Sequence, residues 1–120
     1  MPDEQTGRLT VHVLDTTRGV PAASMPLALY RIEKDVRTLL ATRHTNSDGR
    51  CDGPLLLGNS LRPGVYEIVF DIAAWRAAHD DHTDSFYDQV PIRFHISDGA
   101  AHYHIPLLLS PFGYSTYRGS

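Results

Sequence analysis

The sequence predicts an all-β protein, a two-sheet β-sandwich with one short helix. Short segments in which apolar and polar residues alternate recur along the chain, and turn-forming residues separate them. One stretch, from Ile72 to His79, lacks this alternation and contains four alanines, which favours a helix. The chain has 120 residues, 42% of them hydrophobic, which is enough for one packed core but not for two. Together these observations indicate a single sandwich domain.

The first strand is expected at Leu9–Asp15, where Leu9, Val11 and Val13 alternate with Thr10, His12 and Leu14. A loop at Gly19–Ala22 is expected to follow it. The other expected strands are Pro26–Ile32, Thr38–Thr45, Leu55–Leu57, Val65–Asp71, Pro91–Ile96, Tyr103–Leu109 and Tyr114–Tyr117.

Turn signals connect several of these segments. Asn46–Gly49 is interpreted as a hairpin, since Asp-Gly tolerates the positive φ of a tight turn. Arg62–Gly64 is expected to be the turn that precedes the Val65 strand, and Asp80–Asp88 to be a polar loop.

Composition and charge argue against several classes of partner. The net charge is −3, and ten arginines and one lysine are scattered, so we expect neither nucleic acid nor membrane as a partner. No apolar run approaches the roughly 20 residues of a membrane-spanning helix, and the polar start lacks signal-peptide features. We therefore expect a cytoplasmic protein. Cys51 is the single cysteine, and we expect a small buried or half-buried side chain rather than a nucleophile.

The C-terminal segment is unusually apolar. It contains no charged residue from Ile105 to Tyr117, although 21% of the whole chain is charged. Within Tyr103–Leu109 both alternating faces are apolar, whereas a sandwich strand needs one such face. The second face predicts an oligomer contact. The alternative is an internal strand covered by the tail of its own chain.

Most of the seven histidines are expected to be solvated or structural, because they lie near turns or polar neighbours: His44, His79, His82, His95 and His102. His12 and His104 differ, since each projects away from the core yet lies among apolar residues. Such positions suit the floor of a cleft between subunits, where the pKa of an imidazole stays near neutral. Each could instead be a structural histidine.

Other common chemistries find little support in the sequence. His102 and His104 share a strand face, but no third ligand lies at a familiar spacing, so no metal is expected. The chain also has no Gly-x-Ser-x-Gly elbow and no glycine-rich phosphate loop.

Several motifs resemble those of 5-hydroxyisourate hydrolases, and the resemblance runs from Leu9 to Ser120. The motifs are LTVHVLDTTRGVPA at 9–22, TNSDGRCD at 45–52, RPGVYEIVF at 62–70, VPIRF at 90–94 and HYHIPLLLSPFGYSTYRGS at 102–120. The terminal Tyr-Arg-Gly-Ser is the most specific, because it distinguishes the hydrolases from transthyretin, which has the same fold and carries thyroid hormones.

The resemblance implies a transthyretin-like (prealbumin-like) β-sandwich over residues 9–120, after a flexible segment 1–8. It implies a homotetramer, a dimer of dimers, with active sites in the channel between dimers and no cofactor. The implied reaction belongs to urate (purine) breakdown and converts 5-hydroxyisourate to 2-oxo-4-hydroxy-4-carboxy-5-ureidoimidazoline.

The family's signature residues fall on His12, Arg50, His104 and the tetrapeptide 117–120. We expect His104 to activate water and His12 to position substrate or shuttle the proton, although the two roles could be exchanged. The guanidinium of Arg50 suits substrate carbonyl or oxyanion oxygens.

The terminal tetrapeptide is expected to contribute to the same site. The α-carboxylate of Ser120 is expected to pair with Arg50 or orient a histidine. Tyr117 and Arg118 are expected to contact the substrate, and Gly119 to allow a close approach of the chain.

Two other functions compete with the hydrolase. One is a non-catalytic, transthyretin-like carrier of a small aromatic ligand in the channel between subunits. The other is a structural sandwich, such as an adhesion domain, against which the Tyr-Arg-Gly-Ser terminus argues. Loss of 5-hydroxyisourate above its spontaneous rate would separate the enzyme from both.

Overall fold

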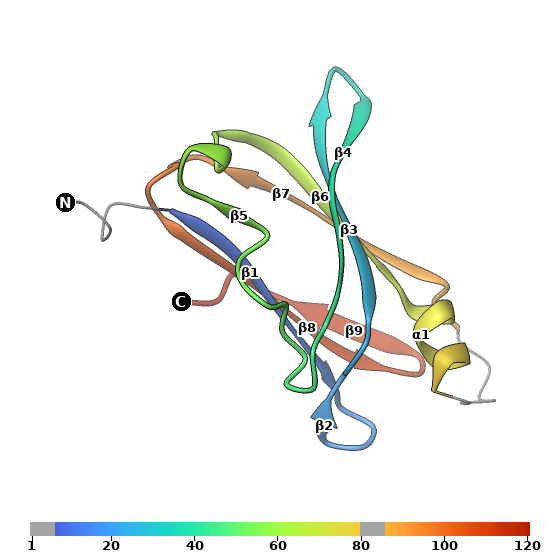
Figure 1. The fold of residues 1–120 in the computed structure, drawn as a ribbon. Coiled ribbons are helices and arrows are strands. Elements are labelled where there is room, and N and C mark those ends of the chain that lie inside the picture. The colour runs from blue at the N-terminus through green and yellow to red at the C-terminus, as the bar shows by residue number, and fades with distance from the viewer. Residues whose placement is uncertain (1–6, 80–85) are drawn as a thin grey trace.

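The computed structural model describes residues 7–79 and 86–120, which form two packed β-sheets (Figure 1). The strands of one sheet are β1 (Arg8–Asp15), β2 (Val20–Pro21), β5 (Leu56–Leu57), β8 (His102–Ser110) and β9 (Gly113–Thr116). Their order is β2-β1-β8-β9, where β2 pairs with the end of β1, and β5 pairs with the start of β1. The predicted two-sheet sandwich is confirmed.

The second sheet has the order β4-β3-β6-β7 and is antiparallel throughout. Its strands are β3 (Pro26–Glu33), β4 (Val36–His44), β6 (Gly64–Asp71) and β7 (Gln89–Ile96). A 3-10 turn, η2 (Gly58–Ser60), precedes β6, and the helix α1 (Ile72–Ala78) connects β6 to β7. The expected helix is thus confirmed to within one residue, with His79 as its C-cap.

The core lies between the inner faces of the two sheets. Alternation in β1 buries Leu9, Val11 and Val13, as the sequence predicted, and turns Thr10 and His12 outward. The largest fully buried side chains of the second sheet include Leu29, Ile68, Tyr66 and Phe70. Outward positions of β1 are therefore free to form a site while inward positions stabilise the sandwich.

The parallel pairing of β1 with β8 joins the two ends of the chain. Its register places Thr10 beside His104 and His12 beside Pro106. Side chains of paired residues in neighbouring strands lie on the same face of a sheet. This register therefore carries the outward side chains of β1 and β8 to one surface.

Two expected turns differ from the structure. Gly19–Ala22 is not simply a loop, because Val20–Pro21 pairs with the end of β1. Asn46–Gly49 is a tight turn, with φ of 78° at Gly49, but it does not join two neighbouring strands of one sheet. The prediction of a hairpin there was wrong, because the chain leaves the β4 sheet after the turn and Arg50 pairs with His12 of the other sheet.

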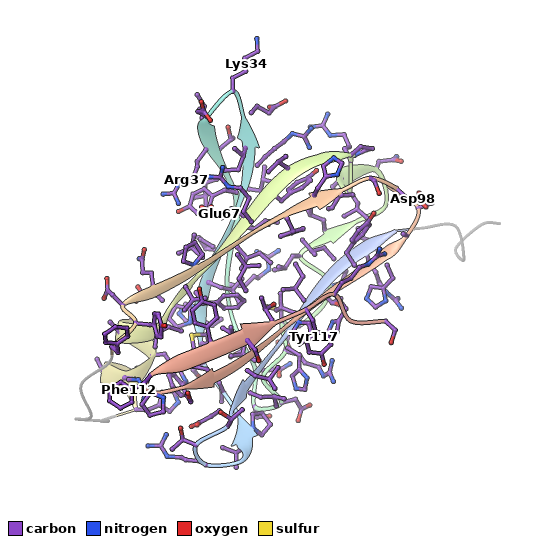
Figure 2. The ribbon with its side chains drawn as sticks, turned by 180° about the vertical axis from the view of Figure 1, so that it is seen from behind. Lys34, Arg37, Glu67, Asp98, Phe112 and Tyr117 are labelled. Atoms are coloured by element: carbon purple, nitrogen blue, oxygen red, sulfur yellow. The ribbon has the colours of Figure 1, made fainter. Side chains whose placement is uncertain are left out.

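The hairpin between β3 and β4 turns instead at Lys34 and Asp35, whose φ angles are 50° and 64°. Positive φ at both central residues is typical of a type I′ turn, which fits the twist of paired strands. Lys34 lies at the tip of this hairpin (Figure 2). The sequence prediction began the strand at Thr38 and missed the turn, because Lys-Asp is not a familiar signal for it.

The predicted flexible segment 1–8 and the predicted loop Asp80–Asp88 both lie partly outside the described residues. Of the predicted flexible segment 1–8, Arg8 belongs to β1 and Gly7 is buried. Most of the predicted loop Asp80–Asp88, including His82, falls on residues that are not described. Within the described ranges, no helix is long and apolar enough to cross a membrane.

The apolar C-terminal strand is internal to its sheet. β8 lies between β1 and β9, Pro106 is buried, and Leu108 is half-buried. Gly119 of the tail also pairs with His104. The pairing with β1 and β9 makes β8 an internal strand, and within one chain its second face leaves Leu108 partly exposed. Exposed aromatic side chains lie instead at Phe112 and Tyr117 (Figure 2).

We expect Leu29→Ala to destabilise the fold by about 2–5 kcal/mol, because it removes a fully buried side chain from the centre of the sandwich. Urea denaturation followed by circular dichroism measures this change. Leu39→Ala is the matched control, since Leu39 is 55% exposed, and it should change stability by no more than about 0.5 kcal/mol. Equal losses in the two variants would contradict this account of the core.

Candidate active site

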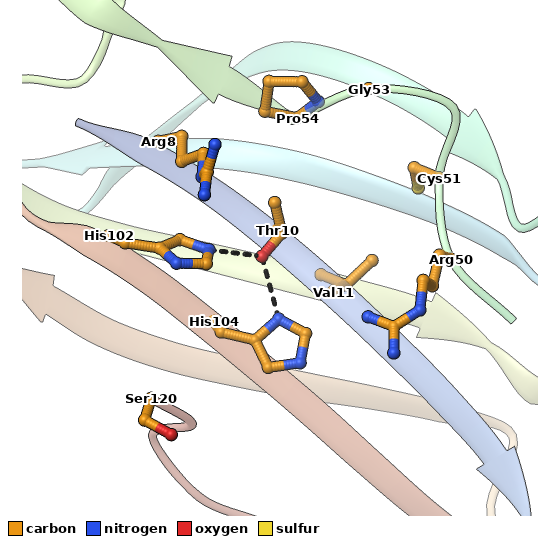
Figure 3. Close-up of a pocket in the computed structure, with 10 residues that line it drawn as sticks. All are labelled: Arg8, Thr10, Val11, Arg50, Cys51, Gly53, Pro54, His102, His104 and Ser120. Carbon is orange, nitrogen blue, oxygen red and sulfur yellow. Dashed lines mark hydrogen bonds between the residues drawn. The ribbon is translucent and has the colours of Figure 1, made fainter. Parts of the chain in front are cut away.

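A pocket of about 470 Å³ opens on the outer face of β1 and β8, beneath the segment 50–54 (Figure 3). Its lining residues come from the first strand, the segment after the Gly49 turn, β8 and the terminus: Arg8, Thr10, Val11, Arg50, Cys51, Gly53, Pro54, His102, His104 and Ser120. The pocket therefore gathers three predicted site residues, Arg50, His104 and Ser120.

The Asn46–Gly49 turn places Arg50 at this pocket. The Oδ1 atom of Asn46 accepts hydrogen bonds from the backbone N–H groups of Asp48 and Arg50 at 2.9 and 3.1 Å. Gly49 accepts a hydrogen bond from Val13 N at 2.8 Å, and a Cβ atom at Gly49 would collide with the Val13 carbonyl. Glycine is needed here for both the positive φ and the close approach to β1.

The Arg50 side chain is solvent-exposed in the single chain. Among residues 7–79 and 86–120, no hydrogen bond or ion pair engages its guanidinium, and its planar donors suit the oxygens of a flat substrate.

His104 lies at the centre of the pocket and bonds to Thr10. Its Nδ1 atom lies 2.8 Å from Thr10 Oγ1, and the same hydroxyl lies 2.9 Å from His102 Nε2 (Figure 3). Burial lowers the pKa of His104, the positive charge of Arg50 lowers it further, and His102 and His12 act in the same direction when they are protonated. The imidazole is therefore kept neutral, the form that can accept a proton.

The C-terminal tail packs directly on His104. Gly119 N donates a hydrogen bond to His104 O at 2.8 Å, and a Cβ atom at Gly119 would lie 2.6 Å from His104 Cδ2. The predicted close approach of Gly119 is thus present, and Ser120 reaches the pocket. Among the described residues, the ion pairs do not include one between Arg50 and the terminal carboxylate.

Tyr117 and Arg118 lie at a different surface. Both line a second pocket of about 250 Å³ together with Tyr103 and residues of β7. The Arg118 guanidinium lies 4.3 Å from the centre of the Tyr103 ring and donates a hydrogen bond to His102 O at 3.3 Å. In a single chain, Arg118 therefore anchors the tail, and neither residue lines the pocket of His104.

His12 lies beside this pocket without lining it. Its backbone pairs with Arg50, and its Nε2 atom lies 3.0 Å from the Asp48 carbonyl oxygen. Because a carbonyl oxygen only accepts hydrogen bonds, His12 Nε2 carries the proton in this contact. The charge of His12 nevertheless acts on His104, as described above. His12, Arg50 and His104 thus share one electrostatic environment.

Sequence reasoning missed Thr10, Arg8 and His102 as pocket residues. His102 was expected to be a solvated or structural histidine. The available signal was its i, i+2 spacing from His104, which places both rings on one face of β8. Nothing in the sequence showed that β1 lies parallel beside them.

Cys51 also lines the pocket, and its thiol is free. Burial raises the pKa of this thiol, and Asp52 raises it as well, while Arg43 acts in the opposite direction. The thiol form is therefore favoured over the nucleophilic thiolate, in agreement with the expected half-buried side chain. In the described part of the chain, no group of three or more His, Cys, Asp or Glu residues is arranged to hold a metal ion.

Comparison with known proteins agrees with the fold. The model of the HIUase/Transthyretin family matches residues 9–119. The chain belongs to this family.

The family includes hydrolases similar to this chain along its whole length. "5-Hydroxyisourate hydrolase 2" of Rhizobium meliloti (strain 1021) is 54% identical, and the match covers 97% of this chain and 98% of that protein. The solved structure of Klebsiella pneumoniae 5-hydroxyisourate hydrolase is 34% identical, with a TM-score of 0.79, and the match covers 95% of this chain and 99% of that one.

The family also includes transthyretins of the same fold. Sea bream transthyretin, solved in complex with thyroxine, is 31% identical with a TM-score of 0.84. That match covers 93% of this chain and 94% of the transthyretin. The two kinds of relative therefore share the sandwich, and the residues of the site must decide between them.

We expect Arg50→Gln to raise the pKa of His104, because the variant removes a positive charge that disfavours the imidazolium. The rise should be partial, since burial is the larger cause of the low pKa and remains. NMR titration of the histidine rings measures it.

Arg93→Gln is the matched control, because Arg93 pairs with Glu67 at 3.2 Å on the other sheet. An unchanged His104 pKa in Arg50→Gln, or an equal rise in the control, would contradict the proposed proximity of Arg50.

Proposed function

We propose that this protein hydrolyses 5-hydroxyisourate to 2-oxo-4-hydroxy-4-carboxy-5-ureidoimidazoline, a step of urate breakdown. The observation that supports this proposal is one pocket lined by His104 of β8, Arg50 of the segment after the Gly49 turn, and Ser120 of the C-terminal tail. A neutral imidazole beside an exposed guanidinium is suited to water attack on a carbonyl. Relatives of nearly equal length that are named 5-hydroxyisourate hydrolase support the choice of substrate.

His104 serves as the general base in this proposal. Its Nδ1 atom faces Thr10, so its Nε2 atom lies on the opposite side of the ring and is the nitrogen able to receive a proton from water. His12 is less suited to this step, because its Nε2 atom is engaged with the Asp48 carbonyl. A positioned base of this kind contributes about 10²–10⁴ to the rate.

Arg50 stabilises the negative charge that develops on the attacked carbonyl oxygen. The Asn46–Gly49 turn and the pairing with His12 fix its backbone, so the guanidinium approaches the pocket from a rigid segment. His12 then positions substrate or passes on the proton, since its backbone pairs with Arg50 and it interacts electrostatically with His104.

The terminal carboxylate of Ser120 has a distinct role in the proposal. The described residues that line the pocket include Arg8, Arg50 and two histidines but no Asp or Glu. The α-carboxylate is therefore the anionic group available to orient a histidine or Arg50 when the substrate binds. Contact of Tyr117 and Arg118 with the substrate stays a prediction, and Arg118 supports the tail through Tyr103 and His102.

We include a homotetramer in the proposal. Within the described chain, β9 and β7 form unpaired edges of the two sheets, and both edges border the second pocket. Beside them lie aromatic contacts of Phe86 with Phe112 and of Tyr87 with Tyr114, and Phe112 is 74% exposed. Unpaired edges flanked by exposed aromatic rings favour pairing with a second subunit.

Turnover of freshly prepared 5-hydroxyisourate, followed by its absorbance against the spontaneous rate, tests the function. We expect His104→Asn and Arg50→Gln each to lower kcat/KM by about 100-fold or more, because they remove the base and the charge stabilisation. His44→Asn is the matched control, since His44 is exposed at the end of β4. It should retain wild-type activity.

The fold and the subunit assembly should survive these substitutions, because His104 and Arg50 lie outside the core. Light scattering and circular dichroism check this. A wild-type protein that adds nothing to the spontaneous rate would instead favour the carrier.

The low pKa of His104 predicts the pH dependence of turnover. The base must be neutral, so kcat/KM should fall on acidification through a midpoint below the ordinary histidine value and stay level towards neutral pH. A pH–rate profile of the wild-type protein measures this midpoint. A midpoint above that value would argue against His104 as the base.

A further inference from the structure

The hydroxyl of Thr10 connects two imidazole rings of the pocket. Its Oγ1 atom lies 2.8 Å from His104 Nδ1 and 2.9 Å from His102 Nε2 (Figure 3). The β1–β8 register pairs Thr10 with His104, and His102 projects from the same face two residues earlier. The ring centres are 6.1 Å apart, so the hydroxyl is the group that links the rings.

A single hydroxyl proton limits how the three groups can bond. Thr10 can donate to one ring nitrogen only, so the other ring must donate its own N–H to the hydroxyl oxygen. A neutral imidazole carries one N–H, and burial together with nearby positive charge lowers the pKa of both rings, which favours their neutral forms. When Thr10 donates to one ring, it therefore fixes the tautomers of His102 and His104 together.

We propose that Thr10 is a positioning residue that holds His104 with its proton on Nδ1, so that Nε2 is the basic nitrogen. His104 Nδ1–H donates to Thr10 Oγ1, and the Thr10 hydroxyl donates to His102 Nε2. The choice of this direction rests on the proposed function, because the opposite direction would place a proton on His104 Nε2 and leave no base there.

The two hydrogen bonds that join His104, Thr10 and His102 form a relay, and the cationic side chains around His102 support it. Burial lowers the pKa of His102, and the neighbouring charges of Arg8 and Arg118 lower it further. His102 is therefore favoured in its neutral form, and its Nδ1–H tautomer has a lone pair at Nε2 that can accept from Thr10. Arg118 also donates to the His102 carbonyl and covers Tyr103, which holds this end of β8 in place.

The relay is consistent with the bond changes of hydrolysis. When water attacks the ring carbonyl, a water O–H bond breaks and its proton moves to His104 Nε2, while an oxygen lone pair forms the new C–O bond and the C=O π pair moves onto the carbonyl oxygen beside Arg50. His104 is then an imidazolium that still donates through Nδ1 to Thr10 Oγ1. When that oxyanion collapses, the ring C–N bond breaks and the proton on His104 Nε2 passes to the leaving nitrogen. No rotation of the ring is needed during the step, which suits a preorganised base.

The test compares Thr10→Val, which removes the hydroxyl at nearly constant volume, with Thr10→Ser, which keeps it. In the substrate-free protein, ¹⁵N NMR of the histidine rings should show His104 protonated at Nδ1 in the wild type and in Thr10→Ser. Thr10→Val should shift His104 towards the Nε2–H tautomer. We expect kcat/KM to fall by about 10- to 100-fold in Thr10→Val, with recovery in Thr10→Ser, because a base remains but its tautomer is no longer held.

Two controls keep this inference separate from folding and from the proposed function. Thr38→Val changes an exposed threonine on β4 and should alter neither the tautomer nor turnover. Thermal unfolding identifies any loss of fold in Thr10→Val, and the NMR comparison with Thr10→Ser then decides the inference.

An Nε2–H tautomer of His104 in the wild type, or an unchanged tautomer in folded Thr10→Val, would overturn the relay even if the protein is a hydrolase. Absence of turnover by the wild type would overturn the proposed function. The NMR result would then still decide whether Thr10 sets the tautomer.

Discussion

The parallel pairing of β1 with β8 is the constraint on which the rest of the structure depends. It runs in register from Arg8 beside His102 to Asp15 beside Leu109 and joins the two ends of the chain. Inward residues on both strands enter the core, so burial of those residues sets the register. A shift of one strand by one residue would turn either Thr10 or His104 inward and dismantle the pocket.

Positive charge dominates this pocket although the chain as a whole carries a net charge of −3. Arg50 lowers the pKa of His104, and Arg8 and Arg118 lower that of His102, in each case adding to the effect of burial. The same charges that keep an imidazole neutral also attract the oxygens of a flat, oxygen-rich substrate. One electrostatic arrangement therefore serves both the base and the binding of the proposed substrate.

The sandwich itself does not decide between hydrolysis and transport. Sea bream transthyretin and the Klebsiella pneumoniae hydrolase both match the fold of this chain with high TM-scores. The difference must lie in side chains on a shared frame. Here the polar groups on the outer face of β1 and β8, together with the tail over His104, are what favour the enzyme.

The sequence by itself determined the alternating strands, the short helix and, through the terminal Tyr-Arg-Gly-Ser motif, the resemblance that selects Arg50, His104 and Ser120. These features are local, because side-chain period and turn chemistry are properties of neighbouring residues. The contribution of Thr10, the inclusion of His102 and the separate location of Tyr117 were decided only by tertiary structure. They depend on which strands lie side by side, and a parallel contact between residues about 94 positions apart leaves no periodic trace in either segment.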